Sequence, residues 1–445
     1  MIFESDFIRG GICLVGKGLS KYVYSGAAIA TLAALTACGG NTEDAGGANS
    51  DGVVELSFWA SANPDRDDFK LTMERVEQFN EEHDEIQINV ETTAHADYRT
   101  RLNTQAAGGQ LPDIFQVWPG AELQPLVDGE AVGSLNNIVD HWTEDDLLND
   151  DALADFTFDG EVYAIPTAQN PTSFVFYNVD MLNEMGYEEF PDTYDDFKKL
   201  IEDVREQDMT PIALGNSASW PLQSVYISTI ADRFTGNDFI PEVLEGNRSF
   251  TDDDFVEALG VIEEMVEIGA FNEDLNTLDD NQMLEYFLQE RSAMVIDGNW
   301  GAISMLTNKP DDMNIGIAPF PLGDTPTIST VYGNSWAVNS DLEGEEREAA
   351  ETFFKWMFSE DFYQELIGVG RIVAADVEAP EGADLDPLFV DMLELTQASP
   401  PAPVYDAVLP QAVNNVLQNE LQAITIGRST PEEAAQNIQN AVNAQ

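Results

Sequence analysis

Segments with a strand pattern alternate with segments with a helix pattern along most of the chain, and this alternation most constrains the fold. Residues 53–60 (VVELSFWA) alternate in polarity and are rich in β-branched and aromatic residues, which is typical of a strand. Residues 67–83 follow with apolar side chains on one helical face. Two more strand patterns, IQINV and PDIFQVW, enclose a helix pattern that ends on glycines. Strands that alternate with helices predict βαβ units around a mainly parallel sheet.

The same alternation then starts a second time. Residues 173–179 (SFVFYNV) have a strand pattern, and the next helix pattern begins at Thr193 with Asp196 three residues later, which resembles a capping box. The last helix is expected to begin at Thr430, with Pro431 in its first turn. No repeat of solenoid period is visible. The sequence therefore predicts a body of two α/β lobes.

The charge excludes some partners. The chain has 19 basic and 82 acidic residues, which gives a net charge of −63, so a nucleic-acid partner is not expected. The acidic residues could form a patch for cations or basic partners, or they could adapt the whole surface to concentrated salt, in which self-repulsion is screened. Their spread along the chain favours adaptation to salt.

The N-terminal segment has the pattern of an export signal. Lys17 and Lys21 precede 16 apolar and small residues, a run too short for a membrane span but typical of a signal-peptide core. This run ends before Cys38, as in a bacterial lipobox, and a polar, glycine-rich tether follows. We expect a signal peptide at 1–37, lipid on Cys38, a tether at 38–52, and a protein held at the outer face of the cell membrane. The alternative is an ordinary secretory signal with an incidental cysteine.

Signatures of catalysis and metal binding are missing from the sequence. There is no G-x-S-x-G nucleophile motif and no EF-hand calcium loop. His83, His95 and His141 lack the spacing of metal ligands. Pairs of carboxylates suited to glycoside hydrolysis occur at any spacing among 82 acidic residues, so they carry no information. We therefore expect neither an enzyme nor a metal or other cofactor.

Tryptophans occur where clefts form in α/β proteins. Trp59 and Trp118 end predicted strands, and Trp220, Trp300 and Trp336 stand next to glycine, asparagine or serine in predicted loops. Sugar rings have apolar faces that lie flat on indoles and hydroxyl groups that need amide, carboxylate or guanidinium partners. The pattern favours a sugar-binding cleft, whereas the alternative is that each tryptophan only fills a core.

Several segments, in order, resemble one family. GGQLPDIFQVWPG, FDGEVYAIPTAQNPTSFVFYNVDMLNEMGYEEFPDTYDDF, SAMVIDGNW, VYGNSWAVNSD and TPEEAAQNIQNAVN are similar to segments of the maltose-binding-like solute-binding proteins (family 1) of sugar ABC transporters. The resemblance runs from about Val53 to Gln445. It departs from the family pattern at GVGRIVAAD, which lacks the usual proline after the glycine-rich turn.

The resemblance implies a two-lobed periplasmic-binding-protein-like fold (type II), with hinged lobes and a ligand cleft between them. Lobe 1 would comprise residues 53–168 and 322–372, and lobe 2 would comprise residues 169–321 and 373–445. The chain would cross between the lobes near 167–171, 319–323 and 371–376.

The resemblance also implies a monomer that captures a sugar or oligosaccharide and passes it unaltered to the permease of an ABC transporter, with the lipid anchor as its only membrane contact. The implied ligand-binding residues are Trp59, Trp118, Asn170, Trp220, Trp300, Asn334 and Trp336, with Asn216, Asp297 and Arg371 as hydrogen-bond partners. The alternatives are another solute, such as a polyol, glycerol phosphate or peptide, and a secreted carbohydrate-active enzyme.

Overall fold

The computed structural model describes residues 52–62, 64, 66–144, 146–148, 150–323 and 327–445. The expected signal peptide, Cys38 and nearly all of the tether lie outside the described residues, so the predictions about them stay predictions. Within the described residues, no helix combines the length and the apolar character that crossing a membrane requires.

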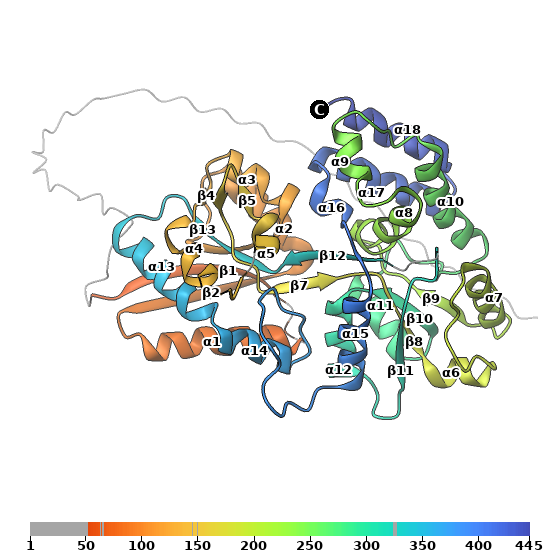
Figure 1. Ribbon diagram of the computed structural model, residues 1–445, viewed down its shortest axis with the longest axis horizontal. Coiled ribbons are helices and arrows are strands. Elements are labelled where there is room, and N and C mark those ends of the chain that lie inside the picture. Colours follow the sequence, from red (N-terminus) through yellow and green to blue (C-terminus); the bar gives the residue numbers. More distant parts are fainter. Residues whose placement is uncertain (1–51, 63, 65, 145, 149, 324–326) are drawn as a thin grey trace, which may run out of the picture. The chain divides into compact units, whose positions relative to one another are not determined.

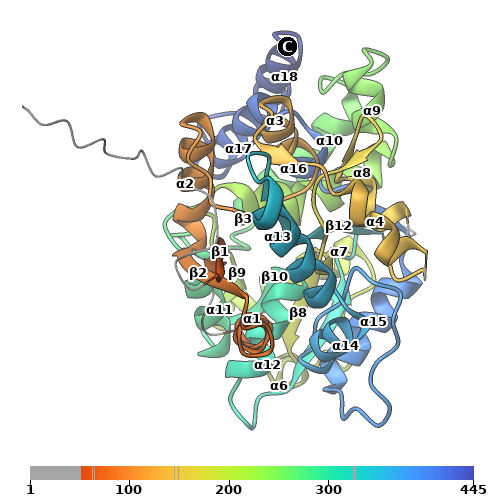
Figure 2. The same cartoon turned by 90° about the vertical axis from the view of Figure 1, so that its left-hand side faces the viewer.

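The first lobe is built around a five-stranded sheet with the order β2-β1-β3-β13-β4. Helices α1 and α13 pack against each other and against this sheet, and α2 packs on β1 and β2 (Figure 2). The elements of this lobe are β1 (Val54–Ala62), α1 (Asp67–Glu82), β2 (Ile86–Ala94), α2 (His95–Ala107), β3 (Ile114–Val117), the 3-10 helix η1 (Gly120–Glu122), α3 (Gln124–Asp128), β4 (Val132–Gly133), α4 (Asn136–Thr143), α5 (Asp150–Ala154), β5 (Thr157–Phe158), β6 (Glu161–Val162), β13 (Ser335–Asn339), α13 (Gly344–Met357) and α14 (Glu360–Gly368).

The second lobe is built around a four-stranded sheet with the order β11-β8-β10-β9 (Figure 1). Alternate residues of β8 and β10 face two different apolar clusters, so helices cover both faces of this sheet. The elements of this lobe are β8 (Phe174–Asn178), α6 (Val179–Glu184), α7 (Tyr194–Arg205), β9 (Thr210–Ala213), the π-helix η2 (Leu222–Ile227), α8 (Ser228–Thr235), α9 (Phe239–Leu244), α10 (Asp253–Glu267), α11 (Asp280–Leu288), β10 (Ser292–Asp297), α12 (Asn299–Asn308), β11 (Ile315–Pro319), α15 (Pro387–Ala398), α16 (Tyr405–Val408), α17 (Gln411–Thr425) and α18 (Pro431–Val442).

The strands on which the prediction of a mainly parallel sheet depends, β1, β2 and β3, are parallel, but both complete sheets are mixed. In the first lobe β1 runs parallel to β2 and β3, but β13 runs antiparallel to β3 and β4. In the second lobe β8 is antiparallel to both β10 and β11, and only β9 and β10 are parallel. The antiparallel strands β8 and β13 enter their sheets directly from segments that join the lobes. The right-handed βαβ connection that makes neighbouring strands parallel therefore does not apply to them.

Short strands join the two lobes. β7 (Ala168–Pro171) pairs antiparallel with β12 (Ile328–Gly333), and both run between the two sheets in Figure 1. A third segment lies beside them, because the Gln169 amide donates to the Ile372 carbonyl at 3.1 Å and the Ala374 amide to the Thr167 carbonyl at 3.3 Å. β12 also pairs with β14 (Pro401–Ala402). The segment that pairs with β7 thus lies later in the chain than the expected 319–323.

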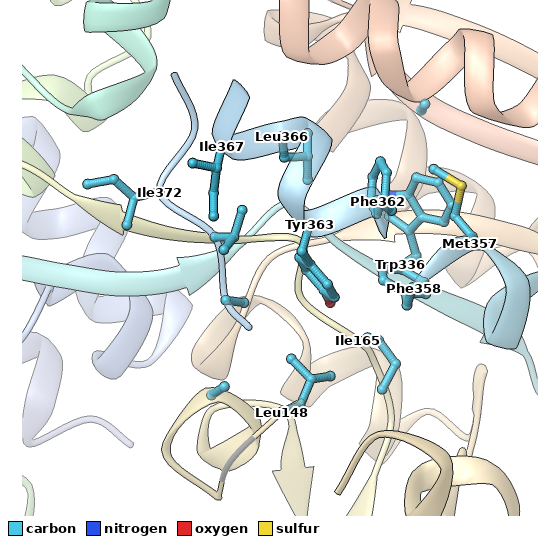
Figure 3. Packing of buried hydrophobic residues seen from close by; sticks show 14 of the residues in the cluster. Leu148, Ile165, Trp336, Met357, Phe358, Phe362, Tyr363, Leu366, Ile367 and Ile372 are labelled. Atoms are coloured by element: carbon cyan, nitrogen blue, oxygen red, sulfur yellow. The ribbon is translucent and has the colours of Figure 1, made fainter. Parts of the chain in front are cut away.

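An apolar cluster of the first lobe packs beside the joining segments. Trp336 on β13 is 3% exposed and contacts Phe58 at a ring-centroid distance of 4.5 Å and Phe358 at 5.1 Å. Figure 3 shows Trp336 grouped with Met357, Phe358 and Phe362, and Ile372 of the third joining segment belongs to the same cluster. The joining segments are therefore packed against a rigid apolar core where they meet the first lobe.

Candidate functional site

A cavity of about 440 Å³ lies between the two lobes and the joining strands. Its size falls within the range of about 300–1,000 Å³ that is usual for small-molecule sites. Its lining includes Arg66, Asp68, Arg99, Trp118, Asn334 and Trp336 of the first lobe, Asn170 and Arg371 of the joining segments, and Trp220, Ser224, Asp279, Asp280, Trp300 and Asp406 of the second lobe.

Trp220 and Trp300 form one corner of the cavity wall. Their ring centroids are 5.7 Å apart and their planes meet at 66°. Trp220 follows Ser219, whose φ of 67° turns the chain into η2, and Trp300 is the second residue of α12. A side chain on Gly298 would lie 2.3 Å from the Trp300 ring, so glycine is needed where the indole folds back over the end of β10. The two indoles are half-buried and line the cavity.

Trp118 contributes a third indole from the opposite lobe. It follows β3, and the Arg99 guanidinium lies 4.4 Å from its ring centroid. Tyr98 meets the same indole edge to face at 5.7 Å, and the Tyr98 hydroxyl donates to the Gln116 carbonyl at 2.9 Å. Neighbours from α2 therefore hold the Trp118 ring in place.

Three charged side chains of the cavity lining, Asp68, Arg66 and Arg371, lie close together. Asp68 is 6% exposed, accepts a hydrogen bond from Arg66 Nε at 2.9 Å, and lies 3.8 Å from Arg371 Nε. Although burial alone would raise the pKa of Asp68, the guanidinium groups of Arg66 and Arg371 lower it. Burial and the charge of Arg66 lower the pKa of Arg371 to about 9, so Arg371 is still a cation at neutral pH.

Arg371 is held by a joining strand and has a donor to spare. Its Nη2 donates to Asn170 Oδ1 at 2.6 Å, whereas its buried Nη1 has no hydrogen-bond partner among the described residues. Arg371 is 2% exposed and lines the cavity. A ligand oxygen in the cavity could satisfy this donor, and a buried donor without a partner is costly otherwise.

The cavity brings together most of the sequence-predicted site residues. They are Trp118, Asn170, Trp220, Trp300, Asn334, Trp336 and Arg371. Asn334 has a φ of 52° between β12 and β13, and its carbonyl accepts from the Thr167 hydroxyl at 3.0 Å. Trp336 touches the cavity wall but is almost completely buried in the core, so neither of its faces is free for a ligand.

Trp59 and Asn216 lie outside the cavity lining. The Arg101 guanidinium lies 3.6 Å from the centroid of the Trp59 ring, and this indole does not line the cavity. Asn216 is fully buried, where its Oδ1 accepts from the Leu222 amide at 3.1 Å and its Nδ2 donates to Asn276 at 2.9 Å. Asn216 therefore holds the start of η2 behind Trp220.

Asp297 lies behind the wall of the cavity, not on it. It is 1% exposed, and its Oδ1 accepts from the Gly298 amide at 2.8 Å. Burial raises the pKa of Asp297 to about 8, the Gly298 hydrogen bond opposes this, and the charge of Asp280 adds to it. A side chain at Gly301 would lie 2.2 Å from Asp297 Oδ2. Asp297 thus supports the turn that carries Trp300.

Several charged residues of the lining were not predicted from the sequence: Arg66, Asp68, Arg99, Asp279, Asp280 and Asp406. The arginines could have been selected because basic residues are rare: the whole chain has only 19, and three arginines line this cavity. The aspartates could not have been selected in this way, because acidic residues are common throughout the chain. Among the described residues, no cluster of histidine, cysteine and carboxylate side chains could hold a metal ion.

Comparison with known proteins places the chain in a family. Residues 74–386 match the model of the bacterial extracellular solute-binding proteins. The multiple sugar-binding protein of Streptococcus mutans is 25% identical over 328 residues, which cover 69% of this chain and 73% of that protein. A chitin oligosaccharide binding protein has a structure with a TM-score of 0.80 at 22% identity, covering 88% of this chain and 98% of that one. A maltose-bound T. maritima protein gives a TM-score of 0.74 at 18% identity, covering 88% of this chain and 100% of that one.

The chain belongs to the bacterial extracellular solute-binding protein family. Its fold is the two-lobed α/β fold of periplasmic binding proteins, as the resemblance of the sequence implied. The family is one of solute-binding proteins, not of enzymes, which agrees with the expectation that the chain is not an enzyme.

Proposed function

We propose that the protein captures a sugar or short oligosaccharide in the cavity between its lobes and delivers it unaltered to the permease of an ABC transporter. The observation that carries the proposal is the indole corner of Trp220 and Trp300, which faces a cavity that also contains Trp118 and the spare donor of Arg371. Indole faces match the apolar faces of sugar rings, and the guanidinium can donate to hydroxyl oxygens.

The named relatives support a saccharide over other solutes. A multiple sugar-binding protein, a chitin oligosaccharide binding protein and a maltose-bound protein all resemble this chain. An erythritol/L-threitol-binding protein of Mycolicibacterium smegmatis is 27% identical over 254 residues, so a polyol is the second candidate. The site itself favours rings, because an acyclic polyol has no flat apolar face to cover an indole.

The proposal includes where the protein works. Cys38 would carry lipid after removal of residues 1–37, and residues 38–52 would tether the lobes at the outer face of the cell membrane. Cys38→Ala should abolish incorporation of labelled palmitate and release the protein into the medium. Palmitate labelling that persists in the variant would contradict the anchor.

Thermal unfolding against a panel of saccharides and polyols, in molar salt, tests the solute class. A ligand present at about 100 times its Kd stabilises the folded state by about 2.7 kcal/mol. We expect a clear increase in the midpoint with at least one saccharide and with no free polyol. An increase with polyols alone would contradict the saccharide proposal, and formation of a new carbohydrate product during incubation would favour an enzyme.

A further inference from the structure

Besides the joining strands, the two lobes contact each other at further places, among them α1 with α12 and η1 with α16. Helix η1 of the first lobe packs on α16 of the second lobe. The Gly120 amide donates to the Asp155 carbonyl at 2.8 Å, which fixes η1 within its own lobe. A Cβ atom added to Gly120 would lie 2.1 Å from the Ala407 carbonyl oxygen. The two backbones are therefore so close that only glycine fits at this position.

Charged side chains from both lobes surround this contact. Arg99 on α2 forms an ion pair with Glu122 at 3.1 Å, and Arg99 and Asp406 both line the cavity. Burial raises the pKa of Glu122 to about 6, Arg99 opposes this, and Asp406 raises it further across the lobe boundary. Burial also raises the pKa of Asp406, whereas Arg99 lowers it. One guanidinium thus lies near a carboxyl group of each lobe.

We propose that η1, Arg99 and α16 form the closing contact of the cleft, and that this contact sets the affinity for the saccharide by setting the fraction of closed protein. The inference depends on the proposed function. Separation of the lobes would move Asp406 away from Arg99 and Gly120 away from Ala407. Closure places the Arg99 guanidinium near the carboxylates of Glu122 and Asp406. A ligand held between the lobes binds more weakly when fewer molecules can close, because the apparent Kd is the intrinsic Kd divided by the competent fraction.

Gly120→Ala tests the steric part of this contact, because Gly120 does not line the cavity. The matched control is Gly109→Ala. Gly109 lies in the same lobe with a φ of 62°, close to the 57° of Gly120, but an added Cβ would meet nothing within 4 Å. The backbone strain of the two substitutions is therefore similar, and only one of them obstructs the contact.

Saccharide titrations and small-angle X-ray scattering of the three purified proteins give the readout. We expect Gly109→Ala to bind and compact like the wild type, and Gly120→Ala to bind at least 10-fold more weakly and to keep a larger radius of gyration with saccharide present. Equal affinity and equal compaction of Gly120→Ala and Gly109→Ala would overturn the closing contact.

A separate experiment tests the charged side chains at the contact between η1 and α16. Arg99→Gln should weaken binding, and adding Glu122→Gln should restore part of the loss, because it removes a carboxylate that faces Asp406. No recovery in the double variant would overturn the role of the charges.

If the wild type binds no saccharide, the proposed function fails, but scattering of the ligand-free proteins still decides this inference. Gly120→Ala should then have a larger radius of gyration than Gly109→Ala, and equal radii would overturn the closing contact.

Discussion

The indole of Trp300 meets that of Trp220 edge to face, with 5.7 Å between their centroids. The two residues are 80 positions apart in the chain: Trp220 follows Ser219 with its positive φ, Trp300 is the second residue of α12, and both line the cavity. A corner of two indoles can contact a saccharide ring on a face and on an edge at the same time. Trp300 is therefore the first residue to substitute.

Trp300→Ala should weaken saccharide binding by roughly 1–3 kcal/mol, or about 5- to 150-fold in Kd, because the saccharide ring loses its contact with the apolar indole. Calorimetric titration measures the change. Trp356→Ala is the control, since Trp356 is also half-buried but packs on Phe79 and Arg75, away from the cavity. Equal Kd values for a folded Trp300→Ala and the wild type would remove Trp300 from the site.

Asp68→Asn should lower the free energy of unfolding by roughly 3–5 kcal/mol, because it leaves the buried Arg371 and the adjacent Arg66 without their shared carboxylate. The neighbouring Asp67→Asn is the control. Asp67 pairs with Lys70 at the surface, where such a pair contributes about 0–1 kcal/mol. Urea unfolding at pH 7 compares the two variants, and equal losses would contradict the buried cluster. Since the pKa of Asp68 is lowered on folding, its contribution is present above the ordinary value of 3.8 and is lost as pH falls through the lowered pKa.

Asp297 should make the wild type less stable as pH rises. Its pKa increases from 3.8 in the unfolded chain to about 8 in the folded protein, so the folded state holds a proton that the unfolded chain has lost. The stability associated with this proton is complete below pH 4 and decreases until about pH 8. Asp297→Asn has no proton to lose, so its melting temperature relative to the wild type should increase between pH 4 and pH 8. A difference that stays constant over this range would show that Asp297 is not a buried neutral acid.

Salt should stabilise the protein. With a net charge of −63, the folded state repels itself, and the Debye length shortens from about 10 Å at 0.1 M salt to about 3 Å at 1 M. We expect the unfolding midpoint to be several degrees higher in molar potassium chloride than in dilute buffer. Sucrose at equal osmolality is the control for effects unrelated to charge. Equal midpoints in dilute buffer and in molar salt would contradict adaptation of the surface to salt.

Local elements of the fold were predictable from the sequence because their signals are local. Thr193 accepts from the Asp196 amide at the start of α7, as predicted, and α18 begins after Thr430 with Pro431 in its first turn, as expected. The full capping box that Thr430 forms with Glu433 was not predicted. The direction of β8 and β13 was not predictable in this way. It depends on how the chain passes between the lobes, which local periodicity does not record.

Residues of the site were predictable where the residue type itself suggests ligand binding, as tryptophan does beside a turn or at the end of a strand. Trp118, Trp220 and Trp300 are large, sit beside turns and line the cavity. Trp59 satisfies the same pattern but does not line the cavity, and its ring packs against Arg101 from α2, which lies 42 positions away in the chain. The closing charges Arg99, Glu122 and Asp406 come from three separate elements, and only the folded chain brings them together.

Calorimetric titration of the purified protein in molar salt, with the saccharides that raise its unfolding midpoint, tests the central claim most directly. We predict binding of one saccharide per chain, a Kd in the micromolar range or below, and recovery of the sugar unaltered afterwards. The absence of binding heat with every saccharide at several temperatures, or recovery of a cleaved sugar, would contradict a cleft that holds and releases saccharides between its indoles.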